Sequence, residues 1–534
     1  MYRSAHIDTF TRDNLPDESL WPELRFDLAA LAYPERVNAA DVLLKSGKPE
    51  DPAIIWTTGR WTYAELTATV NRIARVLTED MGLVPGGRVL LRGRNTAIMY
   101  AAWYAIIKAG GVAVATMPLL RAPELVKICN KAEITIALCE NALMDELSAA
   151  AKLTNQPLKA FGFGDEGAAL EAHMASKADD FDAVDTAQDD VALLAFTSGT
   201  TGEPKACMHF HRDILAMADA YAANILAPRS TDVFTGSPPI AFTFGLGGLV
   251  VFPARFGAAT ALPAGPTPEA LLDIIEHAGV TMLFTAPTAY RALMGKLKGR
   301  DISTLRRCVS AGESLPEATW QAWFECTGLK LMDGIGATEM IHIFIAATEG
   351  EIRPGATGKP VPGYTACVQD ESGKILTPPA TGRLAVRGPT GCRYMADARQ
   401  QKYVQNGWNI TGDTYYMSED GYFTFVARSD DMIISSGYNI GGPEVESALL
   451  THDAVAECAV IGVPDAARGQ IVKAFIVLRR GVDESDELKE ALQHHVKATI
   501  APYKYPRAIE FIDELPKTQT GKLQRFKLKE APRN

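Results

Sequence analysis

Short apolar runs alternate with amphipathic segments through the first 425 or so residues of the chain. Residues 88–91 predict a buried strand, residues 96–109 a helix that Gly110 and Gly111 end, and residues 112–115 the next strand. A strand–helix–strand unit of this length implies parallel strands joined by a crossover helix. A second unit follows in residues 123–138. The pattern predicts an α/β fold, with a large N-terminal domain of mixed sheets covered by helices.

A polar break at residues 428–431 separates this region from a smaller pattern. Strands are predicted at 454–463, 470–478 and 508–512, with a helix at 486–498. A chain of 534 residues also exceeds what one hydrophobic core usually supports. We therefore predict an N-terminal domain over 1–429 and a small, mobile α+β C-terminal lid domain over 430–534.

The segment after the apolar run 191–196 is rich in small polar residues. It reads Thr197, Ser198, Gly199, Thr200, Thr201, Gly202, Glu203, Pro204 and Lys205. Glycine allows close backbone approach, and exposed N–H and hydroxyl groups can surround phosphate oxygens. Two residues separate Gly202 from Lys205, so this is not a Walker loop. On its own the string is also compatible with a mobile surface loop.

Composition narrows the function classes. With 47% apolar and 22% charged residues, the chain is typical of a soluble globular protein. A net charge of -11 argues against a nucleic-acid partner. The most apolar stretch, 101–117, is too short and too interrupted to cross a bilayer, so no membrane partner is expected.

Cysteine and histidine spacing adds little to this picture. The eight cysteines are scattered without a Cys-x-x-Cys pair, and residues 1–8 contain no apolar signal region. Reduced thiols in a cytoplasmic protein are therefore expected, rather than disulfides or zinc. His209 and His211 are predicted to share one face of a strand, but no third metal ligand is apparent.

Further motifs follow the Ser/Thr/Gly segment in a fixed order. They occupy residues 310–316 (Ser-Ala-Gly-Glu-Ser-Leu-Pro), 333–339 (Asp-Gly-Ile-Gly-Ala-Thr-Glu), 411–413 (Thr-Gly-Asp), 428–433, 435–440 and 516–522. This series resembles the adenylate-forming superfamily, which includes acyl-CoA synthetases, firefly luciferase and peptide-synthetase adenylation domains. The resemblance extends from residue 197 to residue 522.

The resemblance implies roles for individual residues. Lys522, Thr338 and Glu339 would be catalytic, and Glu339 would also bind Mg²⁺. ATP and AMP would be bound by Thr197, Ser198, Gly199, Thr200, Thr201, Gly202, Lys205, Gly312, Glu313, Asp333, Gly334, Thr338, Asp413 and Arg428. Asp430 would be the hinge between the domains, and Ser436, Gly437 and Tyr438 would line the coenzyme A tunnel. Asn439 stands where several acyl-CoA synthetases carry arginine, which leaves a nucleotide contact there in doubt.

Residues 333–344 are most similar to benzoate-CoA ligases, and the opening region also resembles 2-aminobenzoate enzymes. By that resemblance Thr243, Phe244, His342 and Ile343 line the ring pocket, where Phe244 offers a flat wall to an aryl group. The expected function is ATP-dependent ligation of benzoate or 2-aminobenzoate to coenzyme A. A medium-chain fatty acyl-CoA synthetase and a free-standing enzyme that loads a carrier protein remain alternatives. Relatives are often homodimers, but the sequence leaves the oligomeric state open.

Overall fold

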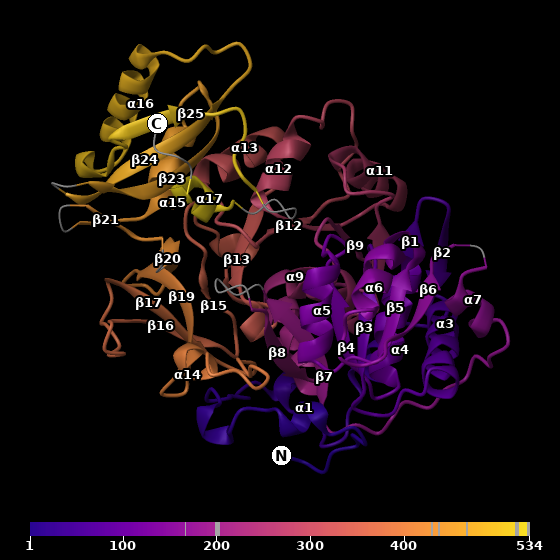
Figure 1. Cartoon of the computed structure of the whole chain (residues 1–534). Coiled ribbons are helices and arrows are strands. Elements are labelled where there is room, and N and C mark those ends of the chain that lie inside the picture. The colour runs from indigo at the N-terminus through magenta and orange to yellow at the C-terminus, as the bar shows by residue number, and fades with distance from the viewer. Residues whose placement is uncertain are drawn as a thin grey trace.

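The computed structural model describes residues 1–165, 167–197, 203–428, 431–435, 438–465, 468–517 and 523–530. In the larger domain, mixed sheets are covered by helices, and a smaller domain lies beyond β20 (Figure 1). The predicted fold class is therefore confirmed. The boundary predicted between residues 429 and 430 lies outside the described residues.

The first large sheet contains the predicted strand–helix–strand unit. Val89 is paired in parallel with Ala113 on one side and Ile136 on the other, which confirms the crossover connection. In spatial order its strands are β6 (Lys159–Phe163), β5 (Ile136–Glu140), β3 (Arg88–Arg92), β4 (Val112–Thr116), β7 (Val191–Thr197) and β8 (Lys205–Phe210). β8 is antiparallel to β7, so residues 198–204 connect the two strands of a hairpin.

The second large sheet is parallel in its centre and antiparallel at both edges. In spatial order its strands are β15 (Lys359–Pro360), β14 (Ile343–Ala346), β13 (Leu331–Gly336), β12 (Arg307–Ser310), β11 (Met282–Thr285), β9 (Val233–Gly236), β10 (Ala259–Leu262), β1 (Pro52–Trp56) and β2 (Gly59–Thr62). Parallel strands end at the same edge, so the loops after β12 and β13 are brought together.

Two further sheets complete the described structure. An antiparallel sheet contains β16 (Thr365–Gln369), β17 (Ala380–Arg387), β18 (Val404–Gln405), β19 (Trp408–Met417) and β20 (Phe423–Arg428). The small-domain sheet contains β21 (Ile433–Ser435), β22 (Tyr438–Ile440), β23 (Val455–Asp465), β24 (Gly469–Leu478) and β25 (Ala508–Phe511). In Figure 1 the small domain lies above the antiparallel sheet.

Helices cover these sheets in both domains. Those of the large domain are α1 (Phe10–Asp13), α2 (Ala39–Leu44), α3 (Tyr63–Arg75), α4 (Ala97–Lys108), α5 (Ala122–Lys131), α6 (Met144–Ala151), α7 (Ala169–Met174), α8 (His211–Met217), α9 (Thr243–Leu246), α10 (Phe252–Arg255), α11 (Pro268–Ala278), α12 (Pro287–Met294), α13 (Glu317–Thr327) and α14 (Gln400–Tyr403). The small domain has α15 (Gly442–Leu450), α16 (Asp486–Thr499) and α17 (Arg525–Glu530). Short π-helical turns, η3 (Val76–Asp80), η5 (Ala218–Leu226) and η6 (Gly247–Val251), extend α3, α8 and α9.

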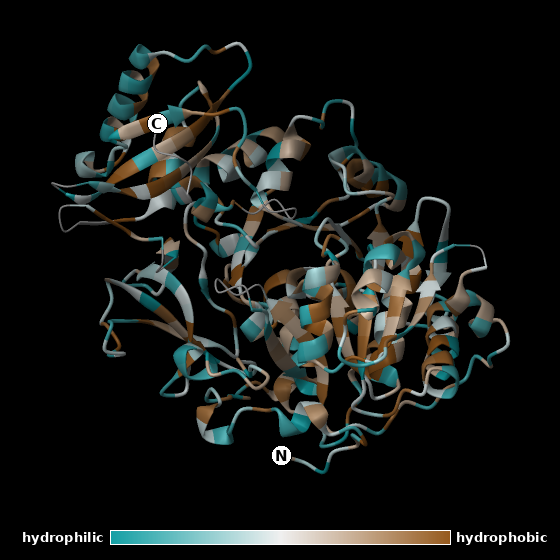
Figure 2. Ribbon diagram, viewed as in Figure 1, coloured by the Kyte–Doolittle hydropathy of each residue, from teal (hydrophilic) through white to brown (hydrophobic). Residues whose placement is uncertain are grey.

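Helix α4 shows how the sequence sets these elements. Thr96 accepts a hydrogen bond from the Met99 N–H and so caps the first turn of α4, and Ala109 caps its last turn. Its residues Trp103 and Ile107 are completely buried, which explains why the segment is apolar on most of its surface. Hydrophobic residues concentrate in the central strands and in the helices that pack on them (Figure 2). Among the described residues, no helix combines the length and apolar character needed to cross a membrane.

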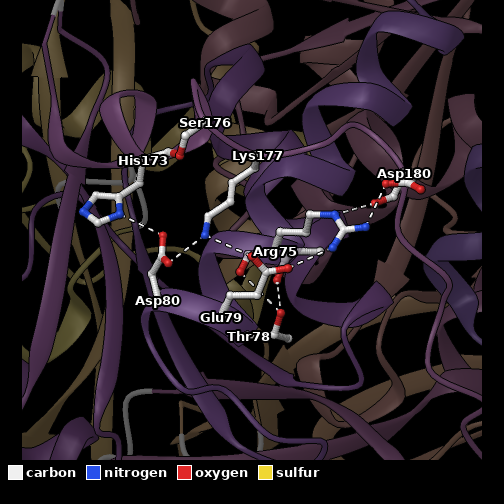
Figure 3. Close-up of polar contacts among 9 residues, drawn as sticks. Arg75, Thr78, Glu79, Asp80, His173, Ser176, Lys177 and Asp180 are labelled. Atoms are coloured by element: carbon white, nitrogen blue, oxygen red, sulfur yellow. Dashed lines mark hydrogen bonds and ion pairs between the residues drawn. The ribbon is translucent and has the colours of Figure 1, made fainter.

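Charged side chains connect the C-terminal end of α3 to the segment after α7 (Figure 3). Lys177 donates to Glu79 at 3.0 Å and to Asp80 at 2.7 Å. Arg75 donates to Glu79 at 2.8 Å and to Asp180 at 2.7 Å. Exposed pairs of this kind contribute little individually, so this network orders a surface segment rather than determining the fold.

His209 and His211 do not share a strand face, which corrects the prediction. β8 ends at Phe210, and His211 is the first residue of α8. His209 lies against the Thr338 carbonyl, whereas the His211 ring accepts a hydrogen bond from the Ala39 N–H at 3.1 Å. The described part of the chain contains no group of three His, Cys, Asp or Glu side chains suited to a metal ion.

Replacing His211 by asparagine is expected to reduce the acid sensitivity of folding. Burial lowers the pKa of His211 from 6.5 to about 3, so the folded chain keeps this ring neutral while the unfolded chain binds a proton below pH 6.5. The neutral His211 therefore makes its full contribution to the free energy of unfolding above pH 6.5, and this contribution is lost as the pH falls. Between about pH 7.5 and 5.5 the loss is ~1.4 kcal/mol. Asparagine accepts the Ala39 bond without titrating, so urea unfolding at the two pH values should show a loss smaller by that amount. An unchanged loss would contradict a neutral His211.

Candidate active site

A cleft with a cavity volume of about 1390 Å³ lies between the large and small domains. Its large-domain side contains part of the predicted nucleotide-binding set, namely Gly312, Glu313, Asp333, Gly334, Asp413 and Arg428. Its small-domain side includes residues of α15, β23 and the segments that flank 518–522. The fold therefore gathers motifs that are about a hundred residues apart in sequence into one cavity.

The ends of β12 and β13 build one wall of the cleft. Ser310 and Asp333 are paired in parallel, so the loop after β12 lies beside Asp333. Gly312 in that loop has a φ of +88°, a conformation that favours glycine. Glu313 accepts a hydrogen bond from the Thr288 hydroxyl at 2.6 Å, which orients its side chain toward α12.

Asp333 has an unusual acidity for a carboxyl group. Burial raises its pKa from 3.8 to about 8, and the hydrogen bond from the Gly334 backbone opposes this shift only in part. A carboxyl with such a pKa holds a proton over much of the neutral range. It can then donate one hydrogen bond as well as accept another.

Asp413 and Arg428 face each other across β19 and β20. They are direct register partners, and Arg428 Nη1 donates to Asp413 Oδ1 at 3.1 Å. Asp413 is 8% exposed, whereas half of the Arg428 side-chain surface is accessible. The pair places a nearly buried carboxylate and an accessible cation on the same wall of the cleft.

Lys205 and Glu339 are connected through a residue that the sequence analysis did not identify, Tyr394. The Tyr394 hydroxyl donates to Glu339 Oε1 in a short hydrogen bond and accepts one from Lys205 Nζ at 3.2 Å. The Lys205 ammonium also lies 5.0 Å from the centre of the Tyr394 ring. Glu339 is 9% exposed, so its charge lies in a site with little water.

The turn that carries Thr338 and Glu339 is fixed at both ends. It forms the 3-10 helix η7 (Thr338–Met340). The Thr338 carbonyl is 2.8 Å from His209 Nε2, and the Met340 carbonyl accepts from the Thr390 hydroxyl at 2.8 Å. Burial lowers the pKa of His209 to about 4, so the ring is neutral and its Nε2 carries the hydrogen that the carbonyl requires.

Three of the four predicted ring-pocket residues fall into one aromatic cluster or next to it. The rings of Phe244 and His342 are 5.9 Å apart between centroids, and burial lowers the pKa of His342 to about 3. Thr243, the first residue of α9, is buried beside Phe244 in the chain. Rings that the sequence analysis did not select complete the cluster: Tyr221, Phe252 and Phe284. A neutral imidazole among aromatic rings suits the uncharged ring of an aryl ligand better than a charged group.

Ile343 connects this cluster to the cleft between the domains. A Cβ added at Gly334 would lie 2.8 Å from Ile343 Cγ2, so the isoleucine packs directly over that glycine. Gly334 follows Asp333 and lines the cleft. The aromatic cluster and the cleft therefore adjoin at Ile343 and Gly334.

Several predicted residues lie outside the described residues. These are Ser198, Gly199, Thr200, Thr201, Gly202, Asp430, Ser436, Gly437 and Lys522, and for Tyr438 only the backbone is described. Their described neighbours still limit where they attach. Thr197 and Lys205 are paired across β7 and β8, so the Ser/Thr/Gly segment begins and ends beside the Lys205–Tyr394–Glu339 contact. Lys517 and Leu523 form a bridge, and both line the cleft.

Tyr394 and Tyr221 belong to none of the sequence motifs, so the sequence alone does not point to them. Tyr394 lies in the irregular segment between β17 and α14, and its neighbours in sequence belong to none of the ordered motifs. Tyr221 lies in the π-helical turn η5, where its side chain reads as an ordinary core position. Only the distances between these side chains and Glu339 or His342 assign them to the site.

Comparisons with known proteins agree with this geometry. A family described as AMP-binding enzyme matches residues 45–394, and the AMP-binding enzyme C-terminal domain matches residues 444–522. A benzoate–CoA ligase from Thauera aromatica is 36% identical in an alignment of 523 positions that covers 94% of this chain and 97% of that protein.

Two solved structures of CoA ligases are also similar to this chain. The anthranilate CoA ligase AuaEII in complex with anthranoyl-AMP is similar with a TM-score of 0.90 and 33% identity, covering 94% of this chain and 99% of that one. A benzoate CoA ligase from Burkholderia xenovorans LB400 is similar with a TM-score of 0.84 and 32% identity, covering 92% of this chain and all of that one.

Proposed function

The chain belongs to the AMP-binding enzyme family, and from this premise we propose that it is an ATP-dependent aryl carboxylate–CoA ligase. The family inferred from the ordered motifs is thereby confirmed. The observation that carries the proposal is that the aromatic cluster of Phe244 and His342 adjoins the cleft between the domains, at Ile343 and Gly334. Similarity to ligases named for benzoate and anthranilate supports the same substrate class.

The first half-reaction would be attack of the substrate carboxylate on the α-phosphorus of ATP, which forms an acyl-adenylate and releases pyrophosphate. The obstacle is electrostatic, because an anion must approach a triphosphate of about four negative charges in a site with little water. Lys205 supplies a cation at the end of the Ser/Thr/Gly segment, and we propose that Lys522 supplies another at the reacting oxygens. Asp413 would accept hydrogen bonds from the ribose hydroxyls, and Asp333 with the Gly312 backbone would frame adenine.

The residues around Glu339 fit the magnesium ion that the family implies. Glu339 presents a nearly buried carboxylate, and Thr338 adds a hydroxyl oxygen, both of the hard type that Mg²⁺ prefers. A bound Mg²⁺ would neutralise part of the phosphate charge. The protein's own part is to hold Glu339 in place through η7 and Tyr394.

The second half-reaction would be attack of the coenzyme A thiol on the acyl-adenylate, with AMP as the leaving group. We propose that the small domain turns about Asp430 between the two steps. This turn would replace Lys522 at the site by the loop of Ser436, Gly437 and Tyr438. The proposed boundary between residues 429 and 430 follows from this role.

A test of the reaction class is the nucleotide product. We expect AMP and pyrophosphate in an assay with benzoate, ATP, Mg²⁺ and coenzyme A, because in the proposed reaction the carboxylate attacks the α-phosphorus. Release of ADP and phosphate would contradict the proposal. If the acyl-adenylate forms but does not react with coenzyme A, the result would instead indicate an enzyme that loads a carrier protein.

A test of the substrate is a panel of acids with a variant at Thr243. Benzoate or 2-aminobenzoate should exceed octanoate by at least tenfold in kcat/KM, because the pocket presents aromatic faces. In Thr243→Ala, an ortho amino group that meets the Thr243 hydroxyl in the wild type would be left unpaired, which costs ~1–3 kcal/mol in a dry site. Thr243→Ala should therefore lower the ratio of 2-aminobenzoate to benzoate activity and leave benzoate activity nearly unchanged. If octanoate is the best substrate, the aryl proposal is wrong.

A further inference from the structure

Tyr394 lies between two oppositely charged groups that the reaction needs apart. Its hydroxyl accepts from Lys205 and donates to Glu339, so lysine and glutamate are each one hydrogen bond from the same oxygen. The phenol is completely buried.

The backbone around Tyr394 is hydrogen-bonded to a neighbouring strand. The Met208 N–H donates to the Arg393 carbonyl at 2.8 Å and the Met395 N–H to the Ala206 carbonyl at 2.9 Å, so this segment pairs with β8. The Tyr394 N–H itself donates to Gln400 Oε1 at 2.9 Å. The position of the phenol is thus fixed from β8, the strand that begins with Lys205.

The neighbouring residue adds a second anchor. Arg393 and Asp213 are both completely buried and form a short ion pair. Breaking a buried pair is costly because it leaves an uncompensated charge. The segment that carries Tyr394 therefore has little freedom to move toward or away from Glu339.

We propose that Tyr394 is a positioning residue that keeps Lys205 and Glu339 from pairing directly with each other. Without the phenol oxygen, the half-buried Lys205 and the nearly buried carboxylate of Glu339 would attract each other and close the gap. Their charges would then neutralise each other. Lys205 would be withdrawn from phosphate, and Glu339 from the metal ion.

This inference rests on the proposed function, and its test uses a matched pair of tyrosine variants. Tyr394→Phe removes the shared oxygen and keeps the ring. Tyr403→Phe removes a hydroxyl from the ring that packs edge-on to Tyr394 at 5.8 Å, and that hydroxyl has no hydrogen-bond partner among the described residues. The two variants therefore differ in the bridge between Lys205 and Glu339.

We expect Tyr394→Phe to weaken ATP binding by at least tenfold, measured by calorimetry both in EDTA and with Mg²⁺. The rate of AMP formation should fall about tenfold or more, while Tyr403→Phe stays within about twofold of the wild type. In a Lys205→Met background the effect of Tyr394→Phe should largely vanish, because no lysine remains to pair with Glu339. A purely structural role for Tyr394 predicts the same loss in both backgrounds.

Equal behaviour of the two tyrosine variants, or additive effects of Tyr394→Phe and Lys205→Met, would overturn the inference. A wild type that forms no AMP with any acid would instead overturn the proposed function, while the EDTA binding comparison would still test Tyr394. If Tyr394→Phe fails to fold, the full-length chain labelled with [ζ-¹³C]tyrosine replaces it. Glu339→Gln should then shift one tyrosine resonance, and the absence of any shift would count against the bridge.

Discussion

Lys522→Ala is expected to slow acyl-adenylate formation by ~10²–10³-fold, the usual scale for the loss of one group that stabilises transition-state charge. Lys522 lies outside the described residues, but Lys517 and Leu523 on either side of its loop both line the cleft that contains Asp333 and Asp413. The chain on either side of residues 518–522 is thus held at the cleft. Pyrophosphate exchange with benzoate and ATP measures this half-reaction.

The second half-reaction distinguishes a catalytic lysine from a structural one. Thioester formation from supplied acyl-adenylate and coenzyme A should survive in Lys522→Ala, because we propose that the small domain has by then carried the lysine away. Lys489→Ala is the matched control, since Lys489 is an exposed lysine of the same domain paired with Asp486 at 2.9 Å. Equal loss of both half-reactions would show that Lys522 stabilises the domain instead.

Glu339→Gln is expected to lower acyl-adenylate formation by ~10²-fold or more and to raise the Mg²⁺ concentration needed for half-maximal rate. Glutamine keeps the shape and an oxygen that can accept from the Tyr394 hydroxyl, so the variant removes mainly the negative charge. A magnesium titration of pyrophosphate exchange measures the effect.

Glu140→Gln is the control for the loss of a buried carboxylate. Glu140 is 6% exposed and pairs with Arg94 on the first large sheet, away from the residues of the cleft. Its replacement should change stability to urea but leave the magnesium dependence as it is in the wild type. A Glu339→Gln variant with normal magnesium dependence would exclude Glu339 as the metal-binding group.

Local sequence predicted the regular elements well because each depends on contacts close along the chain. The strand at 88–92, the helix that Thr96 caps and the parallel strand at 112–116 all occur as expected. The failure at His211 has a local reason as well. Its spacing from His209 fits a continued strand, but β8 stops at Phe210 and α8 begins. A period of two cannot reveal where a short strand ends.

The order of motifs from Thr197 to Lys522 was sufficient to identify the family, because both the motifs and their order match that family. The sequence also placed Asp333, Asp413 and Arg428 in one group, and these residues share the cleft. It could not select Tyr394, whose partners Lys205 and Glu339 are 189 and 55 residues away.

By itself, the sequence determined the fold class, the family and the identity of the charged residues of the site. Apolar periodicity and motifs are properties of residues close along the chain, so they can be recognised without the structure. Tertiary structure decided which of those charges touch and what lies between them. The pairing of residues 393–395 with β8 brings a phenol between Lys205 and Glu339, and the packing of Tyr221, Phe252 and Phe284 near His342 makes an aromatic cluster. Such contacts depend on strand register and burial between distant segments, and these are fixed only when the sheets pack.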